Sequence, residues 1–251
     1  MSEKADQYND PKFNYKHYWR GRDYEHLAEA VAIRRLLRGR RFKAAVDIGG
    51  GYGRLTGLLR EFSDNVTLAE PSSQQLDIAA GFLRGDPNIK RELMSAENLK
   101  FASGTIDLAV MVRVMHHLPD PNRELNEAAR VLKKDGLLVL EVANYAHARN
   151  RLKHLLKGQK LPEEPIDIRT PANRRSEEVA FVNHNPKTVI KQLAHAGFKV
   201  DKVLSVSNLR SPRLKKMVPM ALMISVERLL QPALAQTYFG PSIFFLARKI
   251  G

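Results

Sequence analysis

Four glycines, at 49, 50, 51 and 53, lie in the stretch Asp47-Ile-Gly-Gly-Gly-Tyr-Gly53, which follows an apolar run. Because glycine has no Cβ, such a loop can turn sharply and let a ligand touch the backbone. A dinucleotide-binding fingerprint requires Gly-x-Gly-x-x-Gly, and its third glycine would fall on Arg54. A start at Gly50 puts Tyr52 where the second glycine belongs. The spacing therefore excludes a pyrophosphate site of that type but leaves a ligand-binding turn.

An acidic residue, Glu70, ends the next apolar run and lies 21 residues after Gly49. A carboxylate about 20 residues beyond the first glycine is the expected partner of a ribose diol. Two hydroxyl groups that donate to one carboxylate make strong, charge-assisted hydrogen bonds. Otherwise Glu70 would be the solvated end of a strand. We therefore expect Glu70, with Pro71 beside it, to bind ribose.

The order Asp-x-Gly-x-Gly-x-Gly resembles motif I of the class I S-adenosylmethionine (SAM)-dependent methyltransferases. The resemblance implies that Gly49, Gly50 and Gly51 lie against the methionyl and ribose parts of SAM. It implies that Asp47 acts on the cofactor through water or its ammonium group, and that Glu70 binds its ribose. It covers residues 44–144 closely and the last two predicted strands loosely.

Two further segments extend this resemblance. Ser95-Ala-Glu97-Asn-Leu-Lys-Phe101 is similar to the Asp-Ala-Glu-x-Leu-Pro-Phe segment that faces the adenine amino group in the family. Ser95 stands where the family often has Asp, so the adenine contact is expected from the Ala96 backbone or from Glu97. Residues 106–121 resemble the fourth strand and following turn of the branch that includes ubiquinone/menaquinone C-methyltransferases.

His116 and His117 follow that fourth predicted strand, where parallel sheets bind ligands. Either histidine can serve as the base if the acceptor must lose a proton, because an unperturbed imidazole titrates near neutral pH. The alternative is that one caps the next helix while the other packs beneath the cofactor. Arg113 is expected to flank the methionine moiety or an acidic substrate, or else to form a surface salt bridge.

The stretch from Tyr15 to Tyr24 is rich in aromatic and guanidinium groups. In related enzymes a leading helix closes over the cofactor, so Arg22 is expected to meet the cofactor carboxylate. Tyr18, Trp19 and Tyr24 would then wall the pocket. The alternative is that these aromatic side chains fasten an N-terminal helix to the sheet.

Short apolar runs alternate with helical patterns along the chain, which is typical of an α/β protein with parallel strand pairing. Strands are predicted at 44–48, 65–69, 106–112, 136–142, 198–206 and 242–248, and helices at 24–37, from about 54, at 73–83, 122–132 and 185–196. The resemblance implies a Rossmann-like, seven-stranded, mostly parallel sheet with a reversed last strand. We expect an N-terminal helical cap (1–40) and a SAM-binding domain (41–251), with insertions at about 145–185 and 209–240 as a substrate lid.

The chain contains no cysteine, which excludes disulfides, thiolate metal sites and cytosine-C5 methylation through a thiol adduct. The Asn-Pro-Pro-aromatic tetrad of amino-methylating nucleic-acid enzymes is absent after the fourth predicted strand. No convergent set of carboxylates indicates a metal. The polar N-terminus and the shortness of the apolar stretches lead us to expect a cytoplasmic protein.

The formal net charge is +14, and residues 149–217 hold 16 Lys and Arg against 6 Asp and Glu. This excess could steer an anionic small substrate, contact RNA phosphates, or bind an anionic membrane surface. The Met- and Leu-rich stretch from Met217 to Val226 suits a lipid interface, a cover for a lipophilic substrate, a core helix of the lid or a homodimer contact. Methyl transfer from SAM to carbon or oxygen of a small or lipophilic acceptor is the favoured function. The alternatives are an RNA methyltransferase and a catalytically inactive SAM-binding partner subunit.

Overall fold

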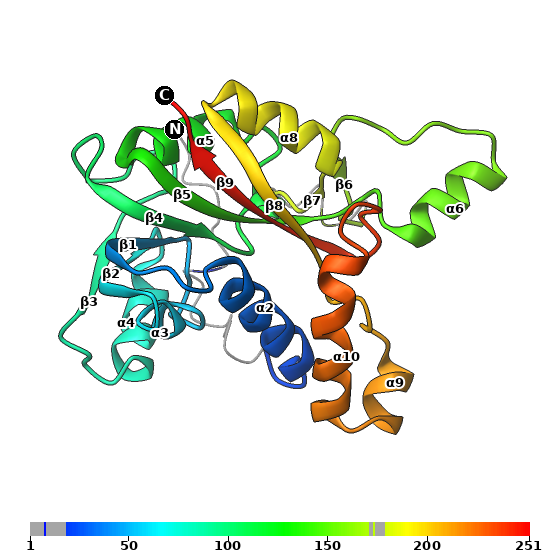
Figure 1. The fold of residues 1–251 in the computed structure, drawn as a ribbon, viewed down its shortest axis with the longest axis horizontal. Coiled ribbons are helices and arrows are strands. Elements are labelled where there is room, and N and C mark those ends of the chain that lie inside the picture. Colours follow the sequence, from blue (N-terminus) through cyan, green and yellow to red (C-terminus); the bar gives the residue numbers. More distant parts are fainter. Residues whose placement is uncertain (1–7, 9–18, 171–172, 174–178) are drawn as a thin grey trace.

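The computed structural model describes residue 8, residues 19–170, residue 173 and residues 179–251. Seven strands form one sheet in the order β3-β2-β1-β4-β5-β9-β8 (Figure 1). Their bounds are β1 (Phe42–Ile48), β2 (Ser63–Glu70), β3 (Ile89–Leu93), β4 (Ile106–Met111), β5 (Leu132–Ala143), β8 (Phe198–Val206) and β9 (Ser242–Lys249). Only β9 runs against its neighbours, so the predicted seven-stranded sheet with a reversed last strand is confirmed.

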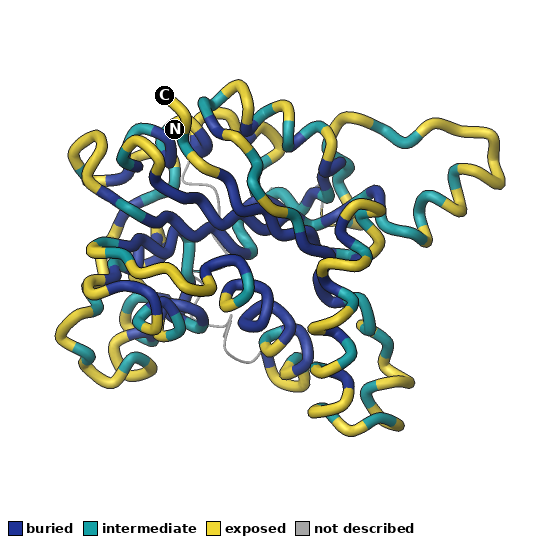
Figure 2. The backbone as a smooth tube through the Cα atoms, viewed as in Figure 1, coloured by how far each residue is buried: buried dark blue, intermediate teal, exposed yellow. Residues whose placement is uncertain are grey.

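The sheet separates two hydrophobic cores, which is why β4 is apolar at every position from Leu108 to Met111. Ala109 and Met111 pack into the core beneath α5 (Asn122–Val131) and α8 (Pro186–His195). The alternate residues Leu108 and Val110 pack into the core beneath α2 (Asp23–Leu36), α3 (Thr56–Leu59) and α10 (Met220–Ala233). Figure 2 shows the buried strands running through the middle of the molecule.

Two elements differ from the sequence prediction, each for a local reason. The helix expected from about Arg54 is shorter, because the chain stays in turns until α3 begins at Thr56. The edge strand β3 was not predicted, because its sequence, Ile-Lys-Arg-Glu-Leu, is mostly polar and mostly exposed. The helix after β2, α4 (Ser73–Phe82), begins where predicted, since the Ser72 hydroxyl accepts a hydrogen bond from the Gln75 backbone N–H.

The two insertions leave the sheet in different directions. The first contains α6 (Ala148–Leu156), which projects from the body of the molecule (Figure 1), and the short strands β6 (Ile166–Asp167) and β7 (Val182–Asn183). The second contains α9 (Pro212–Met217) and α10. Helix α10 packs against α2, and the buried Tyr24 hydroxyl donates to Glu227 Oε2 across this contact at 2.7 Å. Within the described residues, no helix is long and apolar enough to cross a bilayer.

Candidate active site

A cavity of about 330 Å³ opens at the carboxyl ends of β1, β2 and β4, a volume within the usual range for small-molecule sites. Strands of a parallel sheet present their loops together at this edge. Nine of the residues predicted from sequence line it: Gly49, Gly51, Glu70, Pro71, Ser95, Ala96, Glu97, Arg113 and His117. The fold therefore brings together segments that are far apart in the chain.

The loop after β1 is shaped by its glycines. Gly49 and Gly51 have φ angles of +65° and +58°, a region that side chains disfavour. A Cβ at Gly49 would lie 2.5 Å from Val114 Cγ2, and one at Gly50 would lie 2.5 Å from Asp47 Oδ2. Larger residues cannot fit there without displacing these groups, so the backbone itself forms this wall of the cavity.

The Glu70 carboxylate is fixed against the same loop. Its Oε2 accepts the Gly51 N–H at 2.9 Å, and its Oε1 accepts the Ser72 N–H at 3.0 Å. The residue is 6% exposed and lines the cavity. These two backbone hydrogen bonds fix the orientation of the carboxylate at the cavity wall.

Asp47 lies beneath the loop. It is buried, its Oδ2 accepts the Thr56 hydroxyl at 2.6 Å, and burial raises its pKa to about 6. With Gly50 it borders a small adjoining cavity of about 20 Å³, which Arg54 and Arg113 also line. The structure thus places Asp47 under the glycine turn rather than on the main cavity wall.

The structure shows a buried ionic network that the sequence did not reveal. Glu29 of α2 accepts from Arg113 at 2.5 Å and from Arg54 at 2.5 Å, and its side chain is fully buried. Burial alone would raise the pKa of Glu29, but the two guanidinium groups outweigh it and hold the pKa below its usual value. The Trp19 ring stacks 3.6 Å from the Arg54 guanidinium carbon. The network joins α2 to the glycine loop and to the turn after β4.

That turn has an unusual backbone at Arg113, whose φ is +63°. The Arg113 N–H donates to Glu141 Oε2 at 3.0 Å, and the Ser242 hydroxyl donates to Glu141 Oε1 at 2.6 Å. Burial raises the pKa of Glu141. Arg113 therefore reaches the cavity from a turn that is fixed on both its backbone and its side chain.

The two histidines occupy different environments. His116 is 6% exposed, its ring lies 4.0 Å from the His117 ring and 4.5 Å from the Phe181 ring, and burial lowers its pKa well below the usual value. It packs behind the cavity. His117 lines the cavity, with Nδ1 2.9 Å from the Ala180 carbonyl oxygen and Nε2 2.8 Å from the Tyr8 hydroxyl. Since a carbonyl only accepts, Nδ1 carries a proton, and in the neutral form of the ring Nε2 is an acceptor for the Tyr8 hydroxyl.

Other predicted residues lie outside the cavity wall or outside the description. Tyr24 is fully buried in the core beneath α2 and does not line the cavity, so the alternative interpretation as a fastening residue suits it. Arg22 is also absent from the described residues that line the cavity. Tyr18 lies outside the described residues. Glu97, which does line the cavity, is exposed and also pairs with Arg123 at 3.3 Å.

Several lining residues were missed by sequence reasoning. Tyr8, Val179 and Glu124 border the cavity, although they belong to segments that no motif covers. Glu124 is 8% exposed, burial raises its pKa, and its Oε2 has no hydrogen-bond partner among the described residues. Such an orphaned acceptor, or a donor when protonated, suits a polar ligand. No group of three His, Asp or Glu side chains in the described part of the chain has a metal-binding arrangement.

With this geometry established, comparison with known proteins identifies the family. The family model described as a methyltransferase domain matches residues 18–203. The chain belongs to this methyltransferase family. The match covers well over half of the chain, so the resemblance to the class I methyltransferases is confirmed.

Curated relatives match a shorter segment. An uncharacterised methyltransferase of Bacillus subtilis, YcgJ, is 28% identical over 40% of this chain and 40% of its own length. The rice (Oryza sativa subsp. japonica) 2-methyl-6-phytyl-1,4-hydroquinone methyltransferase 1 is 37% identical over 38% of this chain and 29% of its own length. The chain therefore aligns with well under half of the length of these relatives.

Solved structures confirm the fold over nearly the whole chain. A SAM-dependent methyltransferase of Thermotoga maritima superposes with a TM-score of 0.64, covers 94% of each chain and is 21% identical. At that identity the likeness concerns the architecture alone.

Proposed function

We propose that this protein transfers a methyl group from SAM to carbon or oxygen of a small or lipophilic acceptor. One observation carries the proposal: the glycine loop and the Glu70 carboxylate meet on one cavity, inside a methyltransferase-family domain. The rice relative, which is named for a prenylated hydroquinone substrate, supports an acceptor of that kind.

The residues present fit SAM in size and polarity. Glu70 would accept from the ribose hydroxyls, while the backbone at Gly49 and Gly51 leaves space beside it. Arg113 would attract the methionyl carboxylate. The segment from Ser95 to Glu97, with the unpartnered Glu124 oxygen, would meet the adenine.

The chemistry asks little of the protein beyond alignment. SAM supplies a methyl group on a sulfonium, which is already a strong leaving group. This chain's residues must orient the acceptor and exclude water. Where the acceptor is a phenol or enol, His117 Nε2 is the available base, because Nδ1 donates to the Ala180 carbonyl and so keeps Nε2 an acceptor. In the described structure the Tyr8 hydroxyl contacts that nitrogen. The hydroxyl of a bound acceptor would take the place of the Tyr8 hydroxyl.

We also propose that residues 1–40 form a cap and that the insertions form a lid over the same cavity. Tyr8 lies in the first of these segments, and Val179 lies in the first insertion; both line the cavity. No lining residue in the described part of the chain comes from 209–240, whose helix α10 packs against α2 and β8. The first insertion therefore supports the lid proposal better than the second.

Calorimetric titration with S-adenosylhomocysteine tests the cofactor site. We expect micromolar binding by the wild type and its loss in Glu70→Ala, while Glu92→Ala, an exposed carboxylate on β3, retains it. No binding by the wild type would overturn the proposal. Transfer of a labelled methyl group to hydroquinones and phenols by the isolated chain then tests the acceptor class, and turnover in isolation excludes an inactive partner subunit.

A further inference from the structure

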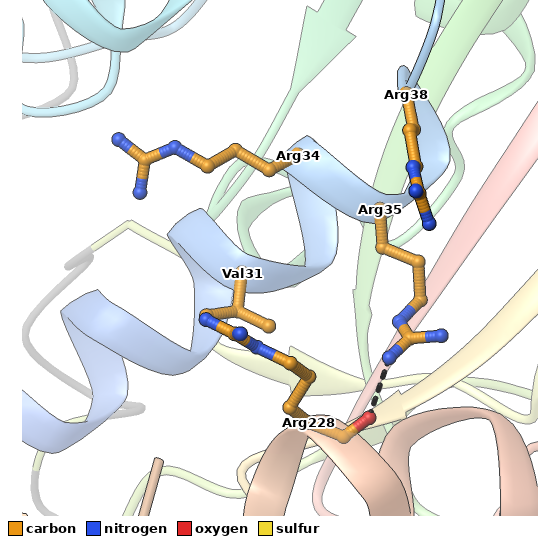
Figure 3. A pocket seen from close by; sticks show the side chains of 5 residues that line it. All are labelled: Val31, Arg34, Arg35, Arg38 and Arg228. Atoms are coloured by element: carbon orange, nitrogen blue, oxygen red, sulfur yellow. Dashed lines mark hydrogen bonds between the residues drawn. The ribbon is translucent and has the colours of Figure 1, made fainter. Parts of the chain in front are cut away.

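A second cavity, of about 230 Å³, lies between α2 and α10 and has no part in the methyl-transfer site. Four arginines and Val31 line it: Arg34, Arg35 and Arg38 from the α2 segment and Arg228 from α10 (Figure 3). We call it the arginine pocket. No carboxylate is among these lining residues.

Most of this positive charge lacks an acidic partner. Arg34 makes a bidentate pair with Glu61, at 2.6 and 2.8 Å, and points away from Arg35 and Arg38 in Figure 3. Arg35 Nη2 donates to the Arg228 carbonyl oxygen at 2.7 Å, and its buried Nε has no hydrogen-bond partner in the described structure. Ion pairs among the described residues include neither Arg38 nor Arg228.

The acids of the two helices are directed elsewhere. Glu25 accepts from Lys215, and Glu29 holds Arg54 and Arg113. Glu227, next to Arg228 in sequence, is buried and accepts from Tyr24 and from the Ser207 backbone N–H. Glu25, Glu29 and Glu227 are therefore paired away from the arginine pocket, and Arg35, Arg38 and Arg228 are left to an external anion.

Guanidinium groups gathered in one pocket suit a phosphate group, because their planar forks donate in pairs to its oxygens. Helix α10, which supplies Arg228 to the pocket, also exposes Leu222 and Leu229, 55% and 72% accessible, two turns apart on one face. Basic groups next to exposed leucines are typical of surfaces that enter a lipid interface. None of the described residues that line the pocket is aromatic and able to stack on a base, which disfavours single-stranded RNA.

We propose that the arginine pocket binds the phosphate group of an anionic phospholipid while Leu222 and Leu229 enter the adjoining lipid surface. The site is separate from the methyl-transfer cavity, so the proposal stands independently of the proposed function. In this proposal α2 and α10 together form a lipid-binding surface in addition to packing against each other.

Co-sedimentation of the full chain with vesicles tests this proposal. We compare phosphatidylcholine vesicles with vesicles that also contain phosphatidylglycerol. The wild type is expected to bind the anionic vesicles, and R35Q/R38Q to bind them about tenfold or more weakly. R84Q/K90Q removes the same charge from two exposed positions, one after α4 and one on β3. It is expected to bind within about threefold of the wild type, since charges far from the bound membrane contribute little. Circular dichroism and S-adenosylhomocysteine binding verify that each variant is folded.

Two further variants distinguish a built phosphate pocket from diffuse charge. R35K/R38K keeps the charge but loses the paired donors, so it is expected to bind anionic vesicles more weakly than the wild type. L222S/L229S is expected to lose vesicle binding while retaining arginine-dependent binding of inorganic phosphate. Wild-type vesicle binding by R35K/R38K, or by R35Q/R38Q, would overturn the pocket. Arginine-dependent binding of RNA or inorganic phosphate without binding of anionic vesicles would overturn the lipid assignment.

Discussion

Individual carboxylates of the site differ in the role that their surroundings allow. Glu70 is held by two backbone N–H groups at the cavity wall, whereas Asp47 is buried under the glycine turn with Thr56 as its hydrogen-bond donor. Both stand at motif positions, yet only Glu70 faces the space that a ligand would occupy. Asp47 is thus suited to hold the loop, although burying its ionised carboxylate lowers the stability of the fold by an amount that depends on pH.

Asp47→Asn should remove that pH-dependent cost to stability, because asparagine does not ionise. The pKa of Asp47 rises from 3.8 to about 6 on folding, so between these values the folded protein holds a proton that the unfolded chain has released. The contribution of Asp47 to stability therefore falls as pH rises across this window. Relative to wild type, the variant should gain on the order of 3 kcal/mol between pH 4 and pH 7. Urea unfolding at both pH values measures it, and Asp77→Asn, at an exposed position on α4, should track the wild type. A constant difference between Asp47→Asn and wild type would contradict the prediction.

His117 should matter to chemistry and little to cofactor binding. Its Nε2 is the acceptor that faces the cavity, while His116 is buried behind it. With a phenolic acceptor, His117→Ala should lower kcat by about 100- to 10,000-fold, the usual contribution of a general base. S-adenosylhomocysteine titration should still show binding. His195→Ala, exposed at the end of α8, is the matched control. An unchanged kcat would remove His117 from the mechanism.

At the scale of elements, α2 is fixed to the site by Glu29. Two arginines, one after β1 and one after β4, pair with this single buried carboxylate, and Trp19 covers Arg54. Removing the carboxylate charge would leave both guanidinium groups buried beside a neutral side chain. The N-terminal helix, the glycine loop and the β4 turn therefore depend on one another.

Glu29→Gln should destabilise the fold by about 3 to 5 kcal/mol, as expected when one member of a buried ion pair is removed. Urea unfolding at pH 7 measures the loss. Glu61→Gln, which breaks the half-exposed pair with Arg34, should cost less than about 1 kcal/mol and serves as the control. Equal losses of unfolding free energy in the two variants would show that the buried Glu29 network contributes no more to stability than the half-exposed pair.

At the scale of the whole molecule, the candidate active-site cavity depends on segments from most of the chain. Tyr8, the glycine loop, Glu70, the turn after β4 and Val179 all border it. A ligand that binds only this assembled state must stabilise the fold as a whole. The positive charge of α2 and α10, in contrast, gathers at the separate arginine pocket.

S-adenosylhomocysteine should therefore raise the free energy of unfolding by about 2.7 kcal/mol at a hundredfold excess over its Kd. Thermal melts with and without ligand measure the effect as a rise in Tm. Glu70→Ala should show no rise, and Glu92→Ala should show the full one. A ligand-independent Tm in the wild type would sink the prediction.

Most of the sheet, and the glycine-loop and Glu70 side of the cavity, could be predicted from sequence because that information is local. A strand, a glycine turn and an acid at the end of the next strand follow one another within 24 residues, from Asp47 to Glu70. Because the strands are parallel, their carboxyl ends then lie at the same edge of the sheet. The polar edge strand β3 was not predicted, because it is mostly exposed and therefore carries no apolar pattern.

Only the tertiary structure decided the remaining partners. Tyr8 meets His117 across 109 residues, Glu29 meets Arg113 across 84, and Arg35 meets the Arg228 carbonyl across 193. Such pairs depend on how α2 and the insertions pack against the sheet, and no spacing in the chain encodes that packing. The same reason separates the two neighbouring histidines, since the turn after β4 sends one ring into the core and the other to the cavity.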